Sequence, residues 1–169
     1  NEKVAMDAAI GAAYAGTRAF TSMKHVGLNV AMDSFMYASM TGVEAGLLII
    51  SADDPSMHSS QNEQDNRNLA KFARIPCLEP SDSQEAKDLT IAAFGLSERF
   101  DTPVMLRMTT RICHTTSAVE LGERMGWEMS AERKEKFPRN PAKYVMVPGN
   151  AMKRHPVIEQ RIKDLAEFA

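Results

Sequence analysis

The chain has few cysteines and no long apolar run, and both shortages restrict what it can be. Only two cysteines occur among the 169 residues. Neither Cys77 nor Cys113 belongs to a CxxC or Cys/His cluster, so we expect two reduced thiols and no disulfide framework. The longest apolar stretch, residues 46–50, is far shorter than the ~20 residues of a membrane-spanning helix. Because no charged leader followed by an apolar segment opens the chain, we expect a cytoplasmic protein without a membrane partner.

An excess of one charge is also missing. The chain has 22 acidic and 20 basic residues, which gives a formal net charge of −2. Such a balance creates no field that would gather nucleic acid or anionic lipid. The length fits one globular domain of ~100–150 residues with a modest appendage. The hydrophobic share of 44% is close to that of a soluble globular protein with a real core.

Several familiar enzyme motifs are absent. There is no glycine-rich phosphate loop of the kind that binds ATP or NAD, and no GxSxG sequence for acyl transfer. The four histidines are scattered without the spacing of metal ligands, so no metal site is expected within this chain.

The pattern of the first 116 residues alternates between strands and helices. The run GLLIISADD is continuously aliphatic and β-branched, which is typical of a strand buried on both faces of a parallel sheet. The alternation predicts an α/β fold with an open, mostly parallel sheet and helices on both faces. The predicted strands cover residues 18–23, 46–54, 75–80 and 104–108, and the predicted helices cover 2–16 (N-cap Asn1), 29–40, 64–73 and 84–100 (cap Ser83).

The character of the chain changes after residue 116, where charged residues dominate. We interpret residues 117–169 as a linker segment that ends in a helix starting near Pro156. That helix carries an apolar stripe of Val157, Ile162, Leu165 and Phe168, which we expect to lie on a partner or on a neighbouring domain outside this chain.

Polar loops follow three of the predicted strands, where open α/β sheets place their ligands. The loops KHVGLN, DDPSMHSSQNEQDN and TTRICHTT would share one edge of the sheet, which predicts a binding site there. Each residue also has a structural alternative: solvated polar loops, an exposed basic pair at Lys24 and His25, and a turn start at Asp53 and Asp54. The rim would hold Lys24, His25, Asp53, Asp54, His58, Ser59, Ser60, Asn62 and Arg111.

Several strings taken together closely resemble the large subunits of indolepyruvate:ferredoxin oxidoreductases. The likeness spans nearly the whole chain, and MKHVGLN and DDPSMHSSQNEQDNR are its most specific parts. It implies a thiamine diphosphate-binding fold, with residues 1–116 as the pyrimidine-binding domain and 117–169 leading to a missing domain. Enzymes of this family oxidatively decarboxylate aryl 2-oxoacids and pass electrons through iron-sulfur clusters to ferredoxin, forming an acyl-CoA. The other strings are NEKVAMDAAIGAAYAG, LEPSDSQEAKDL, SERFDTPVMLRMTTRICH and KRHPVIEQRIKDLAEFA.

The resemblance also implies roles for individual residues. By composition Glu2 is only an acid in a first helical turn, which the helix dipole favours. By the resemblance it matches the glutamate that hydrogen-bonds the aminopyrimidine ring of the cofactor, because Gly11 and Gly16 follow at the family's spacing. Lys24 and His25 would face the substrate side, with His25 catalytic.

The remaining implied roles are looser. Arg111 would bind substrate or coenzyme A, and His58 and Asn62 would line the cofactor cleft. The diphosphate and magnesium motif and the cluster cysteines are missing, so Mg²⁺ and 4Fe-4S clusters are expected in the intact enzyme but outside this chain. The implied partners are the pyrophosphate-binding domain of the same enzyme, a second (beta) subunit, ferredoxin, coenzyme A and the 2-oxoacid.

Two alternatives stay open at this point. The first is a subunit of a pyruvate or other 2-oxoacid:ferredoxin oxidoreductase. The second is a non-catalytic α/β assembly module that kept the fold and lost contact with the cofactor. Under every one of these interpretations the fragment alone is expected to be inactive.

Overall fold

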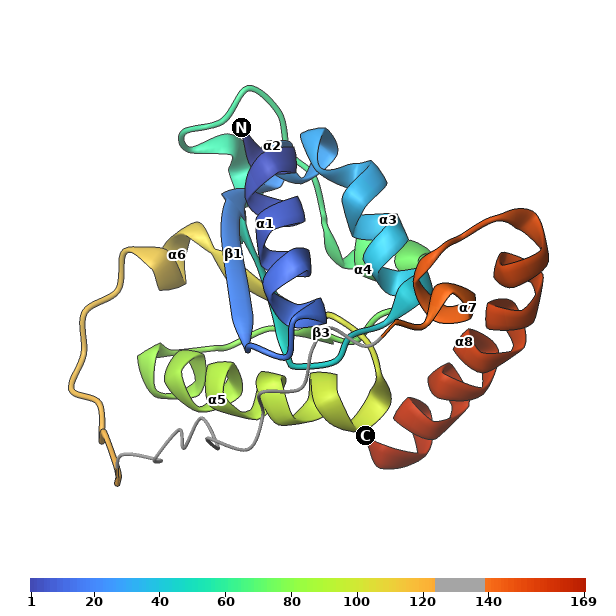
Figure 1. Cartoon of the computed structure of the whole chain (residues 1–169). Helices are drawn as coiled ribbons and strands as arrows, with labels where there is room; N and C mark the ends of the chain where they lie inside the picture. The colour runs from blue at the N-terminus through green and yellow to red at the C-terminus, as the bar shows by residue number, and fades with distance from the viewer. Residues whose placement is uncertain (124–138) are drawn as a thin grey trace.

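A four-stranded parallel sheet forms the centre of the computed structural model, which describes residues 1–123 and 139–169 (Figure 1). The strand order is β1-β2-β4-β3, and each neighbouring pair is parallel. This confirms the predicted α/β fold with a parallel sheet. The strands are β1 (Ala19–Lys24), β2 (Leu47–Asp53), β3 (Cys77–Leu78) and β4 (Val104–Thr109).

Helices cover both faces of this sheet. Side chains along a strand point alternately to opposite sides, so a continuously apolar strand presents apolar side chains on both faces. Leu47 and Ile49 face the larger core, which is formed with α1, α3 and α4. Leu48 faces the smaller core, which contains Ala93 of α5. The helices are α1 (Glu2–Tyr14), α2 (His25–Val30), α3 (Met32–Thr41), α4 (Arg67–Ala73), α5 (Ser83–Phe100), α6 (Thr110–Cys113), α7 (Pro141–Tyr144) and α8 (Pro148–Phe168), with a 3₁₀ turn, η1 (Pro55–Met57).

The first helix forms much as the sequence predicts. The side chain of Asn1 caps α1 by accepting a hydrogen bond from the backbone N–H of Lys3 at 3.0 Å, which satisfies one of the free donors at a helix start. Gly16 lies just after the helix with φ +83°, a conformation that suits glycine. A Cβ on Gly11 would meet no atom within 4 Å, so within the described part of the chain no other element packs closely on this glycine.

Several boundaries differ from the sequence-based expectation, and the strand predicted over 75–80 is confined to Cys77–Leu78. The segment KHVGLN, predicted as a loop, forms α2, and the predicted helix over 29–40 is divided by Ala31 into α2 and α3. The side chain of Asp82, one residue before the predicted cap Ser83, accepts the N–H of Glu85 and starts α5. The last helix begins at Pro148, so that Pro156 lies inside it.

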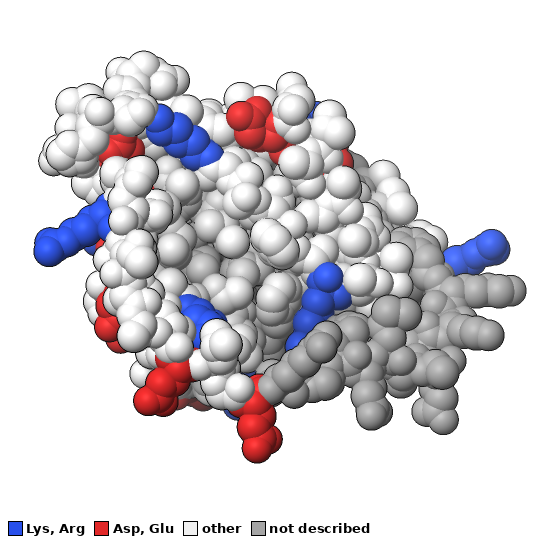
Figure 2. Space-filling view, turned by 90° about the vertical axis from the view of Figure 1, so that its left-hand side faces the viewer, with Lys and Arg blue, Asp and Glu red and all other residues white. Residues whose placement is uncertain are grey.

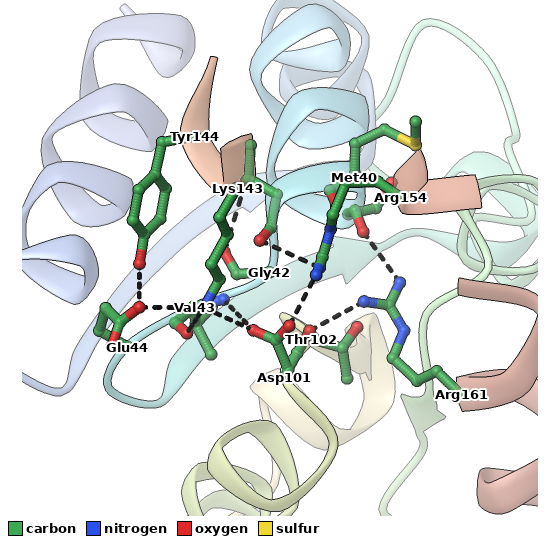
Figure 3. Close-up of polar contacts among 12 residues, drawn as sticks. Met40, Gly42, Val43, Glu44, Asp101, Thr102, Lys143, Tyr144, Arg154 and Arg161 are labelled. Carbon is green, nitrogen blue, oxygen red and sulfur yellow. Dashed lines mark hydrogen bonds and ion pairs between the residues drawn. The ribbon is translucent and has the colours of Figure 1, made fainter. Parts of the chain in front are cut away.

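The carboxylate of Asp101 connects the last two helices to the sheet domain (Figure 3). Asp101 follows α5, and its oxygens bind Lys143 at 3.1 Å and Arg154 at 3.0 Å. Its Oδ1 also accepts the N–H of Val43 at 2.9 Å. A Cβ on Gly42 would lie 2.1 Å from this same oxygen, so only glycine leaves room for the carboxylate.

A second cation of α8, Arg161, is buried against the ends of other helices (Figure 3). Its guanidinium donates to the backbone carbonyl oxygens of Asp101 at 2.8 Å and Ser39 at 2.9 Å. These carbonyls belong to the C-terminal ends of α5 and α3, where the helix dipole favours a positive charge. Burial lowers the pKa of Arg161 to about 10, and the charge of Asp101 opposes this shift. Arg161 therefore stays charged at neutral pH and joins α8 to two helices.

The surface charge matches the small net charge of the sequence. On the face that is turned toward the viewer in Figure 2, blue and red side chains lie apart around a largely uncharged middle, and neither sign gathers into a patch. Within the described residues, no helix has the length and apolarity that a bilayer span requires.

Candidate functional site at the carboxyl ends of the strands

Segments that are distant in the sequence meet at the carboxyl end of the sheet. The amino terminus of α1, helix α2 and the loop after β2 lie at the same end of the molecule (Figure 1). Lys24 closes β1 and Asp53 closes β2, so the residues after them emerge side by side, as parallel strands require. The predicted grouping of the first two loops is therefore present.

Glu2 lies in the first turn of α1 and packs against α2. Its side chain is partly buried, and an ideal Cβ on Gly27 would come within 2.8 Å of Glu2 Cγ and 3.1 Å of Oε1. The carboxylate has no hydrogen bond or ion pair with the described residues. Glu2 is thus a partly shielded acid whose oxygens are available to a ligand.

His25 opens α2 and is completely buried. Its Nε2 faces two oxygen acceptors of Asn62, the backbone carbonyl at 3.1 Å and Oδ1 at 3.3 Å. Because both partners are acceptors, Nε2 must carry the ring proton in the neutral imidazole, and Nδ1 is an acceptor. Nδ1 is buried and has no partner among the described groups. The ring therefore fixes Asn62 on one side and offers a lone pair on the other.

Asn66 connects this histidine to the sheet. The fully buried Asn66 side chain donates from Nδ2 to the His25 carbonyl at 3.3 Å and to Ser51 Oγ at 2.9 Å. Its backbone N–H donates to Asp53 Oδ2 at 3.1 Å. Its Oδ1 is a second buried acceptor without a partner among the described groups. Buried polar groups are rarely left unpaired, so this region contains two acceptors that can take a donor from water or ligand.

Asp54 shapes the loop that follows β2. Its carboxylate accepts the backbone N–H groups of His58 at 3.1 Å and Ser59 at 2.7 Å, and the hydroxyl groups of Ser60 at 2.6 Å and Thr110 at 2.8 Å. These bonds, the one from Ser60 first, hold the pKa of Asp54 far below its ordinary value. Asp54 thus binds the backbone of its own loop, as expected if it starts a turn.

Asp53 is used differently. Its Oδ2 receives Arg107 Nε at 2.7 Å, and Arg107 also reaches Glu79 at 2.8 Å. Asp53 and Arg107 are both buried, so this ion pair belongs to the interior and links β2 to β4. A buried ion pair holds geometry more than it adds stability. Asp53 is therefore part of the scaffold beneath the predicted rim.

The other predicted rim residues are placed less closely together. Lys24 Nζ donates to the backbone carbonyl of Ser59, which brings the end of β1 to the loop after β2. His58 is exposed, and its backbone N–H is bound by Asp54. Arg111 lies exposed in α6 with no polar partner among the described residues. Arg111 is thus near the correct end of the sheet but is not joined to the other site residues.

Three further residues contribute here that the sequence alone did not single out. Gly27 provides the space for Glu2, Asn66 ties α2 to β2, and Thr110 ties α6 to Asp54. A charged residue within an otherwise apolar strand is a recognisable signal, and it could have pointed to Arg107. In contrast, Asn66 stands in a polar run where nothing distinguishes it. Within the described residues, no three His, Cys, Asp or Glu side chains gather as they do around a metal ion.

Comparisons with known proteins identify the class. Residues 1–166 match a family model described as "Pyruvate flavodoxin/ferredoxin oxidoreductase, thiamine diP-bdg", and the chain belongs to this family. It is 52% identical over 168 residues to the indolepyruvate oxidoreductase subunit IorA of Pyrococcus horikoshii, and 44% identical over 168 residues to that of Archaeoglobus fulgidus. Both alignments cover 99% of this chain and 26% of the relative, so the chain spans about a quarter of their length.

More distant proteins share the fold. The 2-oxoglutarate synthase subunit KorA of Methanothermobacter thermautotrophicus is 29% identical over 129 residues, which is 72% of this chain and 34% of that protein. The structure of 2-oxoglutarate:ferredoxin oxidoreductase from Magnetococcus marinus matches the whole chain with a TM-score of 0.68 at 17% identity, and 36% of that chain is covered. The family model and the IorA relatives confirm the family resemblance seen in the sequence.

Proposed function

We propose that this chain supplies the pyrimidine-side half of a thiamine diphosphate site in an enzyme that oxidatively decarboxylates aryl 2-oxoacids, with indolepyruvate as the favoured substrate. The products would be an acyl-CoA and electrons passed to ferredoxin. The observation that carries this proposal is the partly shielded Glu2 carboxylate, without a polar partner among the described residues, in a chain of a thiamine diphosphate-binding family. The names of the relatives at 44% to 52% identity favour indolepyruvate.

The surroundings of Glu2 fit an aminopyrimidine ring. The aliphatic part of the side chain packs on Gly27, which leaves the carboxylate oxygens for a hydrogen bond with a ring nitrogen. Thiamine diphosphate, when bound, supplies a nucleophilic thiazolium carbon that adds to the carbonyl of a 2-oxoacid. Glu2 would hold a proton at the ring nitrogen, and its partial shielding from water would strengthen that hydrogen bond.

The loop residues would line the remainder of the cleft. We assign His58 and Asn62 to cofactor contact, and Lys24, His25 and Arg111 to the substrate side. Lys24 and Arg111 bring positive charge, which suits the carboxylate of a 2-oxoacid or the phosphates of coenzyme A. His25 can act through Nδ1, which has no partner among the described groups and can accept a hydrogen bond.

The other parts of the reaction would lie outside this chain. This chain spans only 26% of the length of its IorA relative. We therefore assign four components to the rest of a longer enzyme: Mg²⁺, the 4Fe-4S clusters, the pyrophosphate-binding domain and the second subunit. We also propose that residues 1–116 form the pyrimidine-binding domain, that residues 117–169 lead to the next domain, and that the enzyme works in the cytoplasm.

The test uses the full-length protein with its second subunit. Glu2→Gln should lower kcat by about 10²–10⁴-fold, the range lost with a general acid or base, while the thermal midpoint shifts by only a few degrees. The matched control is Glu167→Gln, an exposed acid on α8, which should leave both unchanged. Undiminished turnover of Glu2→Gln would reject the role of Glu2, and failure of the wild type to bind thiamine diphosphate would reject the site itself.

The substrate is tested separately. Values of kcat/KM for indolepyruvate, phenylpyruvate, pyruvate and 2-oxoglutarate should be highest for the two aryl substrates. A preference for pyruvate or 2-oxoglutarate would contradict the proposed aryl substrate but not the proposed thiamine diphosphate site.

A further inference from the structure

An apolar groove lies between the end of α8 and the β3 edge of the sheet. Its volume is about 470 Å³, and a second hollow of about 330 Å³ shares Leu78, Leu96 and Phe168 with it. The shared residues make the two hollows one continuous surface, which we call the β3 groove. It lies apart from Glu2 and the loop after β2, none of whose residues line it.

Two helices turn incompletely buried apolar stripes toward the β3 groove. On α8, Ile162 and Leu165 are only partly buried and Phe168 is 53% exposed. On α5, Leu89 and Leu96 are also partly buried. An amphipathic helix gains most of its stability by burying such a stripe. Among the described residues, both stripes therefore remain only partly covered at the same place.

The groove also follows a free sheet edge. Among the described strands, β3 stands last in the order and pairs with β4 alone. Cys77 and Leu78 are neighbours in a strand, so their side chains point to opposite faces, yet both line the groove. The hollow must therefore pass along the outer edge of β3, where the backbone can pair with another strand. An uncovered edge beside apolar side chains invites association.

We propose that the β3 groove is the docking site for the polypeptide that follows α8 in the full-length protein, laid in extended conformation along β3. The curated relatives are about four times as long as this chain, since it spans 26% of them. Ala169 itself lines the groove, so a segment joined to it is held at a millimolar effective concentration. Strand addition with alternate apolar side chains suits both the free edge and the apolar walls.

The test is photocrosslinking in the full-length protein. Phe168→p-benzoylphenylalanine puts the probe in the groove with little change of shape, and Phe72→p-benzoylphenylalanine is the matched control. Phe72 is 69% exposed on α4 and does not line the groove. Mass spectrometry should find the residue 168 probe joined to the same chain within about ten residues after Ala169, a reach of ~33 Å when extended. The residue 72 probe should not give this product.

Three results would overturn the proposal. They are capture of a second copy of the chain, capture of another subunit, and the absence of any protein product from the residue 168 probe. None of them bears on Glu2, because the groove and the thiamine diphosphate site have no lining residue in common. The crosslinking result and the Glu2→Gln result therefore succeed or fail independently.

Discussion

The side chain of Glu2 occupies the space that a Cβ on residue 27 would need, so Gly27 is the partner that allows the acid to lie where it does. The closest approach of an added Cβ is 2.8 Å to Glu2 Cγ, a distance that real side chains do not tolerate. All three atoms near that Cβ belong to the Glu2 side chain. The strain of a larger residue would fall on the acid and not on the backbone.

Gly27→Ala should therefore separate activity from stability. Alanine raises helix propensity by about 1 kcal/mol over glycine, so α2 should be no less stable, while Glu2 is pushed away from its position. We expect turnover of the full-length enzyme to fall by about 10–100-fold, with the thermal midpoint equal or higher. Gly149→Ala, where a Cβ would meet nothing within 4 Å, is the control and should keep full activity. Full activity of Gly27→Ala would contradict the proposed role of Glu2.

His25 is expected to accept only a substitution that keeps a donor toward Asn62. His25→Gln retains an N–H that can reach the Asn62 carbonyl, whereas His25→Leu leaves this acceptor unpaired next to an apolar group. Loss of such a buried partner costs about 1–3 kcal/mol. Equilibrium denaturation curves should therefore give a clearly lower free energy of unfolding for His25→Leu than for His25→Gln. Equal stability of the two variants would show that the hydrogen bond to Asn62 does not contribute to the free energy of unfolding.

The Asp54 carboxylate should keep the loop after β2 ordered over the ordinary pH range. Its pKa is lowered in the folded protein by the Ser60 hydroxyl first and then by the Ser59 N–H. A lowered pKa means that the stabilisation is complete above the unfolded value of about 3.9 and is lost as the pH falls through the folded value.

Exchange rates of the His58 and Ser59 amide hydrogens, corrected for intrinsic chemistry, should thus stay constant between about pH 7 and pH 4, where an aspartate of ordinary pKa would already be about half protonated. Asp54→Asn should expose at least one of the two amides at every pH, because the amides donate to different oxygens and one of these is replaced by a donor. Asp88→Asn, an exposed acid on α5, serves as the control. Faster exchange of these two amides at about pH 4 than at pH 7 in the wild type would contradict the lowered pKa.

Arg161 is expected to be the main attachment of α8. Arg161→Met preserves the length and apolar part of the side chain but removes the donors to the carbonyls of Ser39 and Asp101. We expect a loss of about 2 kcal/mol, the scale of unpaired buried acceptors, seen as faster hydrogen exchange along α8. Lys163→Met, exposed on the same helix, should lie within about 0.5 kcal/mol of the wild type. Unchanged exchange in Arg161→Met would show that α8 is held by other contacts.

The strands were predictable because their residues carry a local signal. The aliphatic run at β2 and the run VMLRMTT at β4 need both faces covered, which only a sheet between helices provides. The same logic placed Lys24, His25 and the loop after β2 at one edge. The family resemblance then added Glu2, which the physical pattern alone treats as an ordinary acid in a helical first turn.

Other features depend on contacts that local patterns do not contain. The segment KHVGLN looks like a loop because glycine and asparagine are poor helix formers, but Gly27 is tolerated in α2 where it packs on Glu2. Pro156 looks like a helix start, yet Pro148 fills that position earlier in the chain. The apolar stripe of α8 could be recognised in the sequence. The burial of Arg161 could not, because this burial depends on the ends of α3 and α5 lying close together in the fold.

Helix α4 lies between the two regions for which a function is proposed, the surroundings of His25 and the β3 groove. The carbonyl of Arg74, the residue that follows α4, is 3.5 Å from the guanidinium of Arg161, and Arg74 also lines the β3 groove. At its other end stands Asn66, bonded to His25 and Ser51. The seven residues of α4 thus connect a residue that lines the β3 groove to the asparagine that bonds the His25 backbone.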